Sequence, residues 1–223
     1  MDRPATIDHV VETVAANAGF MGRDFGVDDG CFWVRSPCGE IKTDREVLPS
    51  SYQFTTENLA GALAIVHHLD IQLTPQALAS LREFQLAGRF QPYTFQGTPL
   101  VFDVAHNADS VALLAERIQQ AGLEGELVAI FGAMKDKALH ALVAPLIGIV
   151  SHWVLVRPRV ERAANVADLR RVLEAAGVCS TAITHCADMT NINTYLKHGE
   201  AAIIYGSFYT VGEAMKNLGV PID

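Results

Sequence analysis

One stretch decides how this chain is expected to fold: Leu100-Val101-Phe102-Asp103-Val104-Ala105-His106-Asn107. An apolar run stops at Asp103, and His106 and Asn107 open a predicted helix. In an open parallel sheet, ligands bind where strands end and helices begin, and a carboxylate, an imidazole and an amide together suit a polar ligand. A helix cap beside a hydrogen-bonded histidine is the alternative interpretation. Only the rest of the chain separates the two.

From Leu100 onward, apolar segments alternate with helical segments. Strands are expected at 100–104, 127–131, 152–156, 181–184 and 201–205, and helices near 107–121, 137–145, 165–176, 189–197 and 208–218. This alternation predicts βαβ units in a mainly parallel sheet with helices on both faces. We therefore predict an α/β domain over residues 89–223.

The first 88 residues follow a different pattern. Helices are expected at 6–18, at 56–68 and from the cap Thr74 to about residue 84, and short antiparallel strands at 23–27, 31–35 and 40–42. Residues 86–90 break the helical pattern, and we place the domain boundary there. Three helices and a β ribbon have too few strands for a complete α/β domain, so residues 1–88 resemble the end of a larger one.

Composition excludes several classes of protein. The net charge of −8 argues against gripping nucleic acid by its phosphates, which requires a basic face. The segment 138–156 lacks charged residues, but Pro145 and Gly148 divide it into a helix end and a strand, so no membrane span is expected. Charges in the first turns disfavour a secretory signal. The four cysteines lack the usual zinc-site spacing, which favours free thiols in the cytoplasm (Cys31, Cys38, Cys179, Cys186).

Polar residues follow the carboxyl ends of four predicted strands. After Asp103 comes a glycine turn with Lys135, Asp136 and Lys137, and later Gly206-Ser207 opens the last helix. The strand at 152–156 leads into three arginines, and one more precedes the first strand (Arg157, Arg159, Arg162, Arg89). Lys and Arg near loops are often merely solvated, but four successive clusters at one sheet edge favour a site for phosphate and carboxylate.

Three common motifs are absent from the sequence. No Gly-x-Gly-x-x-Gly is present, which disfavours a dinucleotide-binding dehydrogenase. No Gly-x-x-x-x-Gly-Lys-Ser/Thr loop is present to cradle phosphates. No Gly-x-Ser-x-Gly is present, so Ser207 has no hydrolase context.

Several motifs nevertheless stand in a specific order. They are Leu86-Ala87-Gly88-Arg89-Phe90-Gln91, Phe102-Asp103-Val104-Ala105-His106-Asn107, Phe131-Gly132-Ala133-Met134-Lys135-Asp136-Lys137 and Gly206-Ser207-Phe208-Tyr209-Thr210-Val211, with Asn58-Leu59-Ala60-Gly61-Ala62-Leu63 upstream. Together they resemble the bacterial folylpolyglutamate synthase/dihydrofolate synthase family of the Mur ligase superfamily. The resemblance implies that residues 89–223 are a Rossmann-like glutamate ligase domain, and that residues 1–88 are the end of the central ATPase domain.

The resemblance also implies an ATP-dependent amide ligase that activates dihydropteroate or folate as an acyl phosphate, which the amine of L-glutamate attacks. Asp103 would hold the ATP ribose, Asn58 would face the adenine, and Asn107 would also contact the nucleotide. Arg89 and His106 would lie near the phosphates, with His106 and Lys135 as catalytic groups. Asp136, Lys137 and Ser207 would contact substrate. The ligands of Mg²⁺ would lie in a missing amino-terminal half, which is the expected protein partner.

Three departures from the family pattern matter. The phosphate loop is absent, Ala138 follows Asp136-Lys137 where the family has Asp-Lys-Asp, and Glu161-Arg162 replaces its Pro-Arg. We therefore expect the carboxyl-terminal part of a ligase, inactive without its amino-terminal half. A non-catalytic nucleotide- or folate-binding or regulatory module that keeps the fold is the alternative.

Overall fold

The computed structural model describes residues 22–28, 31–36, 39–44, 55–69, 71–72, 74, 76–77, 80, 85–123, 126–196 and 201–221. The chain divides into two compact units, Met1–Phe84 and Gln85–Asp223. The helix expected at 6–18 lies outside the described residues, as does most of the helix expected at 74–84. Of the latter, the Thr74 hydroxyl accepts a hydrogen bond from the amide of Ala77 at 3.1 Å, as an N-cap does.

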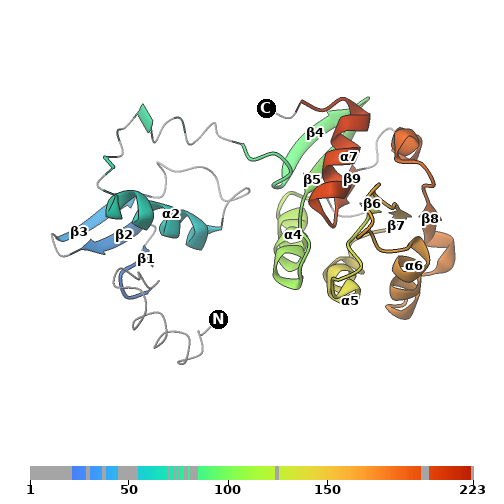
Figure 1. The fold of residues 1–223 in the computed structure, drawn as a ribbon, viewed down its shortest axis with the longest axis horizontal. Coiled ribbons are helices and arrows are strands. Elements are labelled where there is room, and N and C mark those ends of the chain that lie inside the picture. The colour runs from blue at the N-terminus through green and yellow to red at the C-terminus, as the bar shows by residue number, and fades with distance from the viewer. Residues whose placement is uncertain are drawn as a thin grey trace. The chain divides into compact units, whose positions relative to one another are not determined.

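The first unit contains a small antiparallel sheet and a helix (Figure 1). Strands β1 (Phe25–Asp28), β2 (Cys31–Ser36) and β3 (Gly39–Asp44) pair in sequence order, as the turn residues between them predict. Helix α2 (Thr56–His68) begins where expected, because the Thr55 hydroxyl caps it. Phe32, Ala60 and Leu63 are buried together, so α2 covers one face of the sheet.

The second unit is built on a six-stranded sheet. Its strands are β4 (Gln91–Phe95), β5 (Thr98–Asp103), β6 (Leu127–Phe131), β7 (His152–Leu155), β8 (Ile183–His185) and β9 (Ala201–Tyr205). Their order is β4-β5-β9-β6-β7-β8, and every pair is parallel except β4 and β5. The predicted mainly parallel sheet is therefore confirmed.

Helices cover both faces of this sheet. Alternate strand residues point to opposite sides, so Ala129 and Ile203 belong to one core cluster, while Ile130 and Ile204 belong to the other. The first face is covered by α4 (Ala108–Gln120), α5 (Leu139–Val143) and α6 (Val166–Ala175). The second face is covered by α7 (Phe208–Leu218) and the 3₁₀ helix η4 (Met189–Tyr195). Two shorter 3₁₀ helices complete the unit, η2 (Ala144–Leu146) and η3 (Ser180–Ala182).

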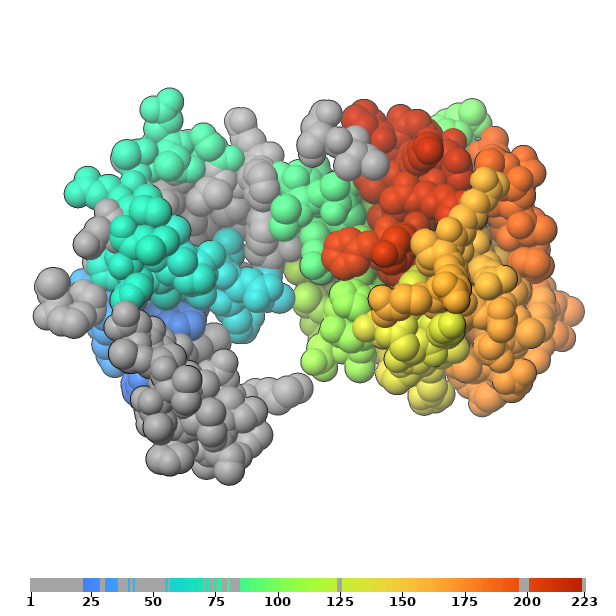
Figure 2. Space-filling model, viewed as in Figure 1, coloured from blue at the N-terminus to red at the C-terminus, as the bar shows by residue number. Residues whose placement is uncertain are grey.

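The pairing of β5 with β9 joins distant parts of the chain. Figure 2 shows residues 201–221, in red, against the green residues around 100. The carboxyl end of β5 therefore lies beside the start of α7, which is the arrangement that builds the site.

Three details differ from the sequence predictions. Strand β4 was not expected, and it contains Pro92, which is tolerated because β4 lies at the edge of the sheet. The segment expected to be a helix at 189–197 is a 3₁₀ helix with a kink at Asn191. The strand expected at 181–184 is instead residues 183–185, because η3 occupies residues 180–182.

Candidate functional site

The carboxyl ends of the strands lie in one row. Across the sheet, Tyr205 stands opposite both Asp103 and Phe131, and Leu155 stands opposite both Phe131 and His185. The loops that follow β5, β6, β7 and β9 therefore leave the sheet at a common edge, which is where open parallel sheets bind ligands.

Asp103 is the last residue of β5, one of the two outermost parallel strands, and its side chain is nearly inaccessible (5% exposed). One carboxylate oxygen accepts a hydrogen bond from the amide of Phe90 at 3.0 Å, and the other accepts one from Ala105 at 2.8 Å. Burial raises the pKa of Asp103, and the two amides together with the charges of Arg117 and Arg89 oppose that rise. The carboxylate is therefore held in one orientation.

Arg117 was missed by the sequence analysis. It lies on α4, is buried (7% exposed), and its guanidinium carbon is 5.9 Å from the centre of the Phe90 ring. Burial lowers the pKa of Arg117, and the nearby Asp103 charge opposes that shift. The signal in the sequence was an arginine among apolar helix positions, between Leu114 and Ile118.

The segment before β4 packs closely against the end of β5. The amide of Val104 donates to the Gly88 carbonyl at 2.8 Å, and the amide of Gly88 donates to Gln91 Oε1 at 2.8 Å. Gly88 has a φ of 68°, and a Cβ there would lie 2.9 Å from Val104 and 3.2 Å from Val211. Glycine at this position thus allows Arg89 to stand beside the end of β5.

The side chains of Arg89 and His106 meet on one aromatic ring, that of Phe208. The imidazole centre of His106 lies 5.8 Å from the ring centre of Phe208, and the guanidinium carbon of Arg89 also lies 5.8 Å from it. His106 Nδ1 is 2.9 Å from the Val104 carbonyl, so Nδ1 carries the proton and Nε2 remains available to a ligand. Phe208 was not among the predicted site residues.

Asn107 is the N-cap of α4, and its side-chain oxygen is already hydrogen-bonded to the helix. Its side-chain oxygen accepts from the amide of Ser110 at 2.9 Å, and the Ser110 hydroxyl accepts from the amides of Asn107 and His106, each at 3.1 Å. This capping box fixes the start of α4. Contact between Asn107 and a nucleotide stays a prediction.

Ser207 is buried and caps α7. Its oxygen accepts from the amide of Thr210 at 3.0 Å and lies 2.8 Å from the Thr210 hydroxyl, which donates to the Gly132 carbonyl at 2.7 Å. The Ser207 hydroxyl therefore donates to Thr210, and this chain of bonds ties the turn after β6 to the turn after β9. Thr210 was missed because its partner lies far away in sequence. Contact between Ser207 and glutamate stays a prediction.

The loop after β6 carries the other predicted substrate residues. The amide of Lys135 donates to the Arg162 carbonyl at 2.9 Å, and the Asp136 carboxylate pairs with the Arg162 guanidinium at 2.9 Å. A hydrogen bond from its own backbone amide, followed by Arg162, lowers the pKa of Asp136. Lys137 is fixed through its amide, which donates to the Met134 carbonyl at 3.2 Å.

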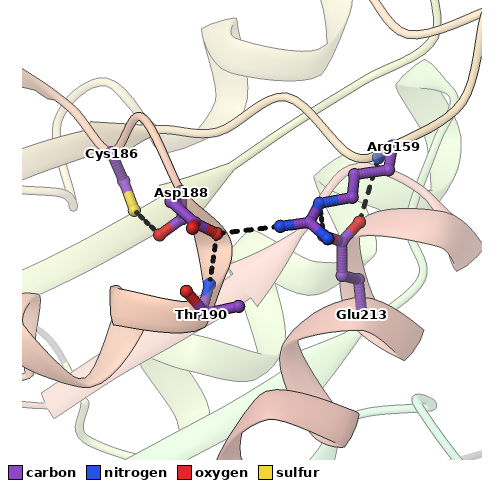
Figure 3. A network of polar contacts seen from close by, with 5 residues as sticks. All are labelled: Arg159, Cys186, Asp188, Thr190 and Glu213. Atoms are coloured by element: carbon purple, nitrogen blue, oxygen red, sulfur yellow. Dashed lines mark hydrogen bonds and ion pairs between the residues drawn. The ribbon is translucent and has the colours of Figure 1, made fainter.

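Arg159 forms a second polar network (Figure 3). Its guanidinium is 3.1 Å from Asp188 and 3.7 Å from Glu213, and its amide donates to Glu213 at 3.0 Å. The amide of Thr190, followed by the Thr190 hydroxyl, lowers the pKa of Asp188. Cys186 donates to the Asp188 carbonyl at 3.2 Å. Because Arg159 pairs with both Asp188 and Glu213, it joins the segment after β8 to α7.

These pairings narrow the predicted cluster of cations. Arg159 and Arg162 are neutralised by carboxylates. Within the described part of the second unit, the cations near this edge that make no ion pair are Arg89, Lys135, Lys137 and Arg157. A bound anion would be attracted mainly by these four side chains.

Asn58 belongs to the first unit and lies on α2, where its backbone amide donates to the Thr55 hydroxyl at 3.2 Å. Its predicted contact with adenine stays a prediction. Among the described residues, no three His, Cys, Asp or Glu side chains gather as a metal site would require. The same residues contain no helix with the length and apolarity needed to cross a membrane.

Comparisons with known proteins agree with this architecture. The family described as "Mur ligase, glutamate ligase domain" matches residues 88–208, more than half of the chain. A dihydrofolate synthase/folylpolyglutamate synthase of Buchnera aphidicola (subsp. Schizaphis graminum) is 28% identical over 202 residues, which cover 85% of this chain and 46% of the relative. The chain thus spans about half the length of the curated relatives it matches.

Solved structures share the fold. FolC of E. coli in complex with DHPP and ADP superposes with a TM-score of 0.77 at 23% identity, over 97% of this chain and 51% of that one. A bifunctional folylpolyglutamate synthase/dihydrofolate synthase with Mn, AMPPNP and L-glutamate bound gives 0.77 at 23% identity, over 98% of this chain and 52% of that one.

Proposed function

We propose that this chain, which belongs to the Mur ligase, glutamate ligase domain family, is the carboxyl-terminal part of an ATP-dependent ligase that joins L-glutamate to dihydropteroate or folate. The observation that supports this most is the edge formed by Asp103, Arg89 and His106. There a fixed carboxylate stands at the end of β5, and a cation and a free imidazole nitrogen gather on one ring beside it.

These residues fit the parts of a nucleotide. Each Asp103 oxygen has one backbone amide and retains a lone pair, which suits the two hydroxyls of a ribose. The Arg89 guanidinium matches the geometry of phosphate oxygens. His106 Nε2 can donate to a phosphate when the ring is protonated.

In the proposed reaction, a carboxylate oxygen of the folate substrate attacks the γ-phosphorus of ATP. The bond to the leaving oxygen breaks, so ADP departs and an acyl phosphate forms. The amine of L-glutamate then attacks the carbonyl carbon, phosphate leaves, and the amine loses a proton as the amide forms. Cations such as Arg89 and Lys135 stabilise the negative charge that develops on the phosphoryl oxygens. We place the ligands of Mg²⁺ in the half of the full-length relatives that this chain does not match.

The 223-residue sequence contains no phosphate loop, so we propose that the chain alone does not ligate glutamate. The test is an assay of ATP- and glutamate-dependent folate ligation, with the chain alone and mixed with the half of a full-length relative that it does not match. We expect activity only in the mixture, and a loss of that activity with Asp103→Asn or His106→Ala. Activity of the isolated chain would contradict the dependence on a second half, and a fully active mixture with either variant would contradict the site.

One observation favours a second candidate, a binding module without catalysis. The family pattern has an aspartate at the position of Ala138, so one carboxylate is missing. Such a module would bind ATP, with affinity lowered by Arg89→Ala, and the mixture would remain inactive. Restoration of ligation by Ala138→Asp would then identify the missing group.

A further inference from the structure

Phe208 is the first residue of α7 and is more than half exposed (58%). Its ring therefore lies at the carboxyl edge of the sheet, where it can contact the side chains that follow β5 and precede β4. Its two aromatic and cationic neighbours are His106, from the β5–α4 turn, and Arg89, from the segment before β4. Both are residues that we assign to the phosphates of the nucleotide.

The backbone on every side of this ring is fixed. Ser207 and Thr210 tie the start of α7 to the turn after β6 through the Gly132 carbonyl. The amide of Arg89 donates to the Leu86 carbonyl at 3.1 Å, and His106 is held through Val104. What the backbone leaves undetermined is the direction of the long Arg89 side chain, which has many rotamers.

A phenyl ring restrains such a side chain in a defined way. Its face attracts a guanidinium within about 6 Å of the centroid, and tilted contacts between aromatic rings are favoured at about 4.5 to 7 Å. Both measured distances, 5.8 Å and 5.8 Å, fall within these limits. We propose that Phe208 is a positioning residue that holds Arg89 and His106 together for the polyphosphate of the nucleotide. This inference rests on the proposed function.

The neighbouring residue provides a matched control. Tyr209 is exposed to nearly the same extent (53%), but among the described residues its ring makes no aromatic contact with His106 and no cation–π contact with Arg89. If Phe208 acted only as one more exposed aromatic residue, Tyr209→Leu and Phe208→Leu would have the same effect. If it positions the two groups, only Phe208→Leu weakens binding.

The experiment titrates the full chain with ATP and, separately, with inorganic triphosphate, by calorimetry at low ionic strength. Phe208→Leu is expected to weaken binding of both about two- to fivefold, the range expected from one exposed cation–π contact. Phe208→Tyr should restore wild-type affinity, Tyr209→Leu should leave it unchanged, and the thermal midpoints should confirm that all variants fold. In an Arg89→Ala, His106→Ala background, Phe208→Leu should have no further effect.

Each other outcome has a distinct meaning. Wild-type affinity in Phe208→Leu, with weaker binding in Arg89→Ala, overturns the positioning role and leaves the proposed function intact. An effect of Phe208→Leu on ATP but not on triphosphate, or an equal effect in the background lacking both partners, shows direct contact with the ligand and also overturns it. No binding of ATP by the wild-type chain, or none lost in Arg89→Ala, contradicts the nucleotide site itself.

Discussion

The carboxylate of Asp103 combines burial with a fixed orientation. Two backbone amides, those of Phe90 and Ala105, donate hydrogen bonds to the carboxylate. Its position is therefore set by the backbone of Phe90 and of the β5–α4 turn. Burial still makes the charged form costly, as the raised pKa shows. The carboxylate is therefore prepared for a ligand at some cost to the folded state.

That cost predicts a dependence of stability on pH. Because the folded-state pKa of Asp103 lies above its ordinary value of 3.8, the folded state binds more protons than the unfolded state between the two values. The free energy of unfolding should therefore fall, relative to that of Asp103→Asn, as the pH rises from 3.8 through the folded-state pKa. Urea unfolding of both proteins across this range measures the difference. A constant difference between them would contradict the raised pKa.

Gly206 is the residue whose replacement should cost most at this edge. Its φ is 113°, and a Cβ would lie 2.5 Å from the Gly132 carbonyl oxygen and 3.0 Å from the Phe131 ring. Gly206→Ala should lower the free energy of unfolding by at least about 3 kcal/mol, since backbone strain and a steric clash add. Gly122→Ala is the control, because Gly122 also has a positive φ (65°) but open space around it. If both substitutions cost the same in urea unfolding, the turn after β9 does not lie in close contact with the turn after β6.

At the scale of elements, the β4–β5 hairpin shapes the outer end of the sheet. Phe95 pairs with Thr98, so Gln96 and Gly97 form a two-residue turn. Both have positive φ, 49° and 86°, as a type I′ turn requires. The hairpin carries Gln91, which accepts from the amide of Gly88, and thereby supports the segment that presents Arg89.

The turn predicts an order of stability among substitutions at Gln96. Asparagine tolerates positive φ better than glutamine, and a β-branched residue tolerates it least. Gln96→Asn should raise the free energy of unfolding by about 0.5 kcal/mol, and Gln96→Val should lower it by about 1 kcal/mol. Thermal unfolding of the three proteins checks the order, and Gln96→Val as stable as Gln96→Asn would contradict the turn type.

The sequence predicts some elements better than others for physical reasons. Strands β6 and β9 and residues 100–102 of β5 are covered on both faces, so they are unbroken apolar runs in the sequence. Strand β4 is a short edge strand that contains a proline, and a proline within a short run argues against a strand. The segment of η4 contains two threonines and two asparagines, which are weak helix formers, so its sequence does not support the regular helix that was expected there.

At the scale of the whole molecule, the register of the parallel strands explains why the residues of the candidate site could be grouped from the sequence. Strand ends meet at one edge whatever their order, so Asp103, His106, Lys135 and Ser207 could be grouped before the order β4-β5-β9-β6-β7-β8 was known. Contacts that depend on that order could not be predicted. Phe208 meets His106 and Thr210 meets Gly132 only because β9 lies between β5 and β6.

The charge of the molecule bears on the same question. The chain has a net charge of −8, and Arg159 and Arg162 are already paired with carboxylates. Binding of an anion must therefore depend on a small local group of cations, and salt should weaken it. A nucleotide bound anywhere else on this acidic surface would need a different explanation.

The central claim, that a nucleotide binds at the carboxyl edge of the second sheet, is tested most directly by mapping ATP on the chain with amide NMR shifts at low ionic strength. We expect the shifts to concentrate in residues 88–91, 103–107 and 206–210, and to disappear in Arg89→Ala. Shifts that concentrate instead in α6 and β8, or an absence of shifts at saturating ATP, would contradict the claim.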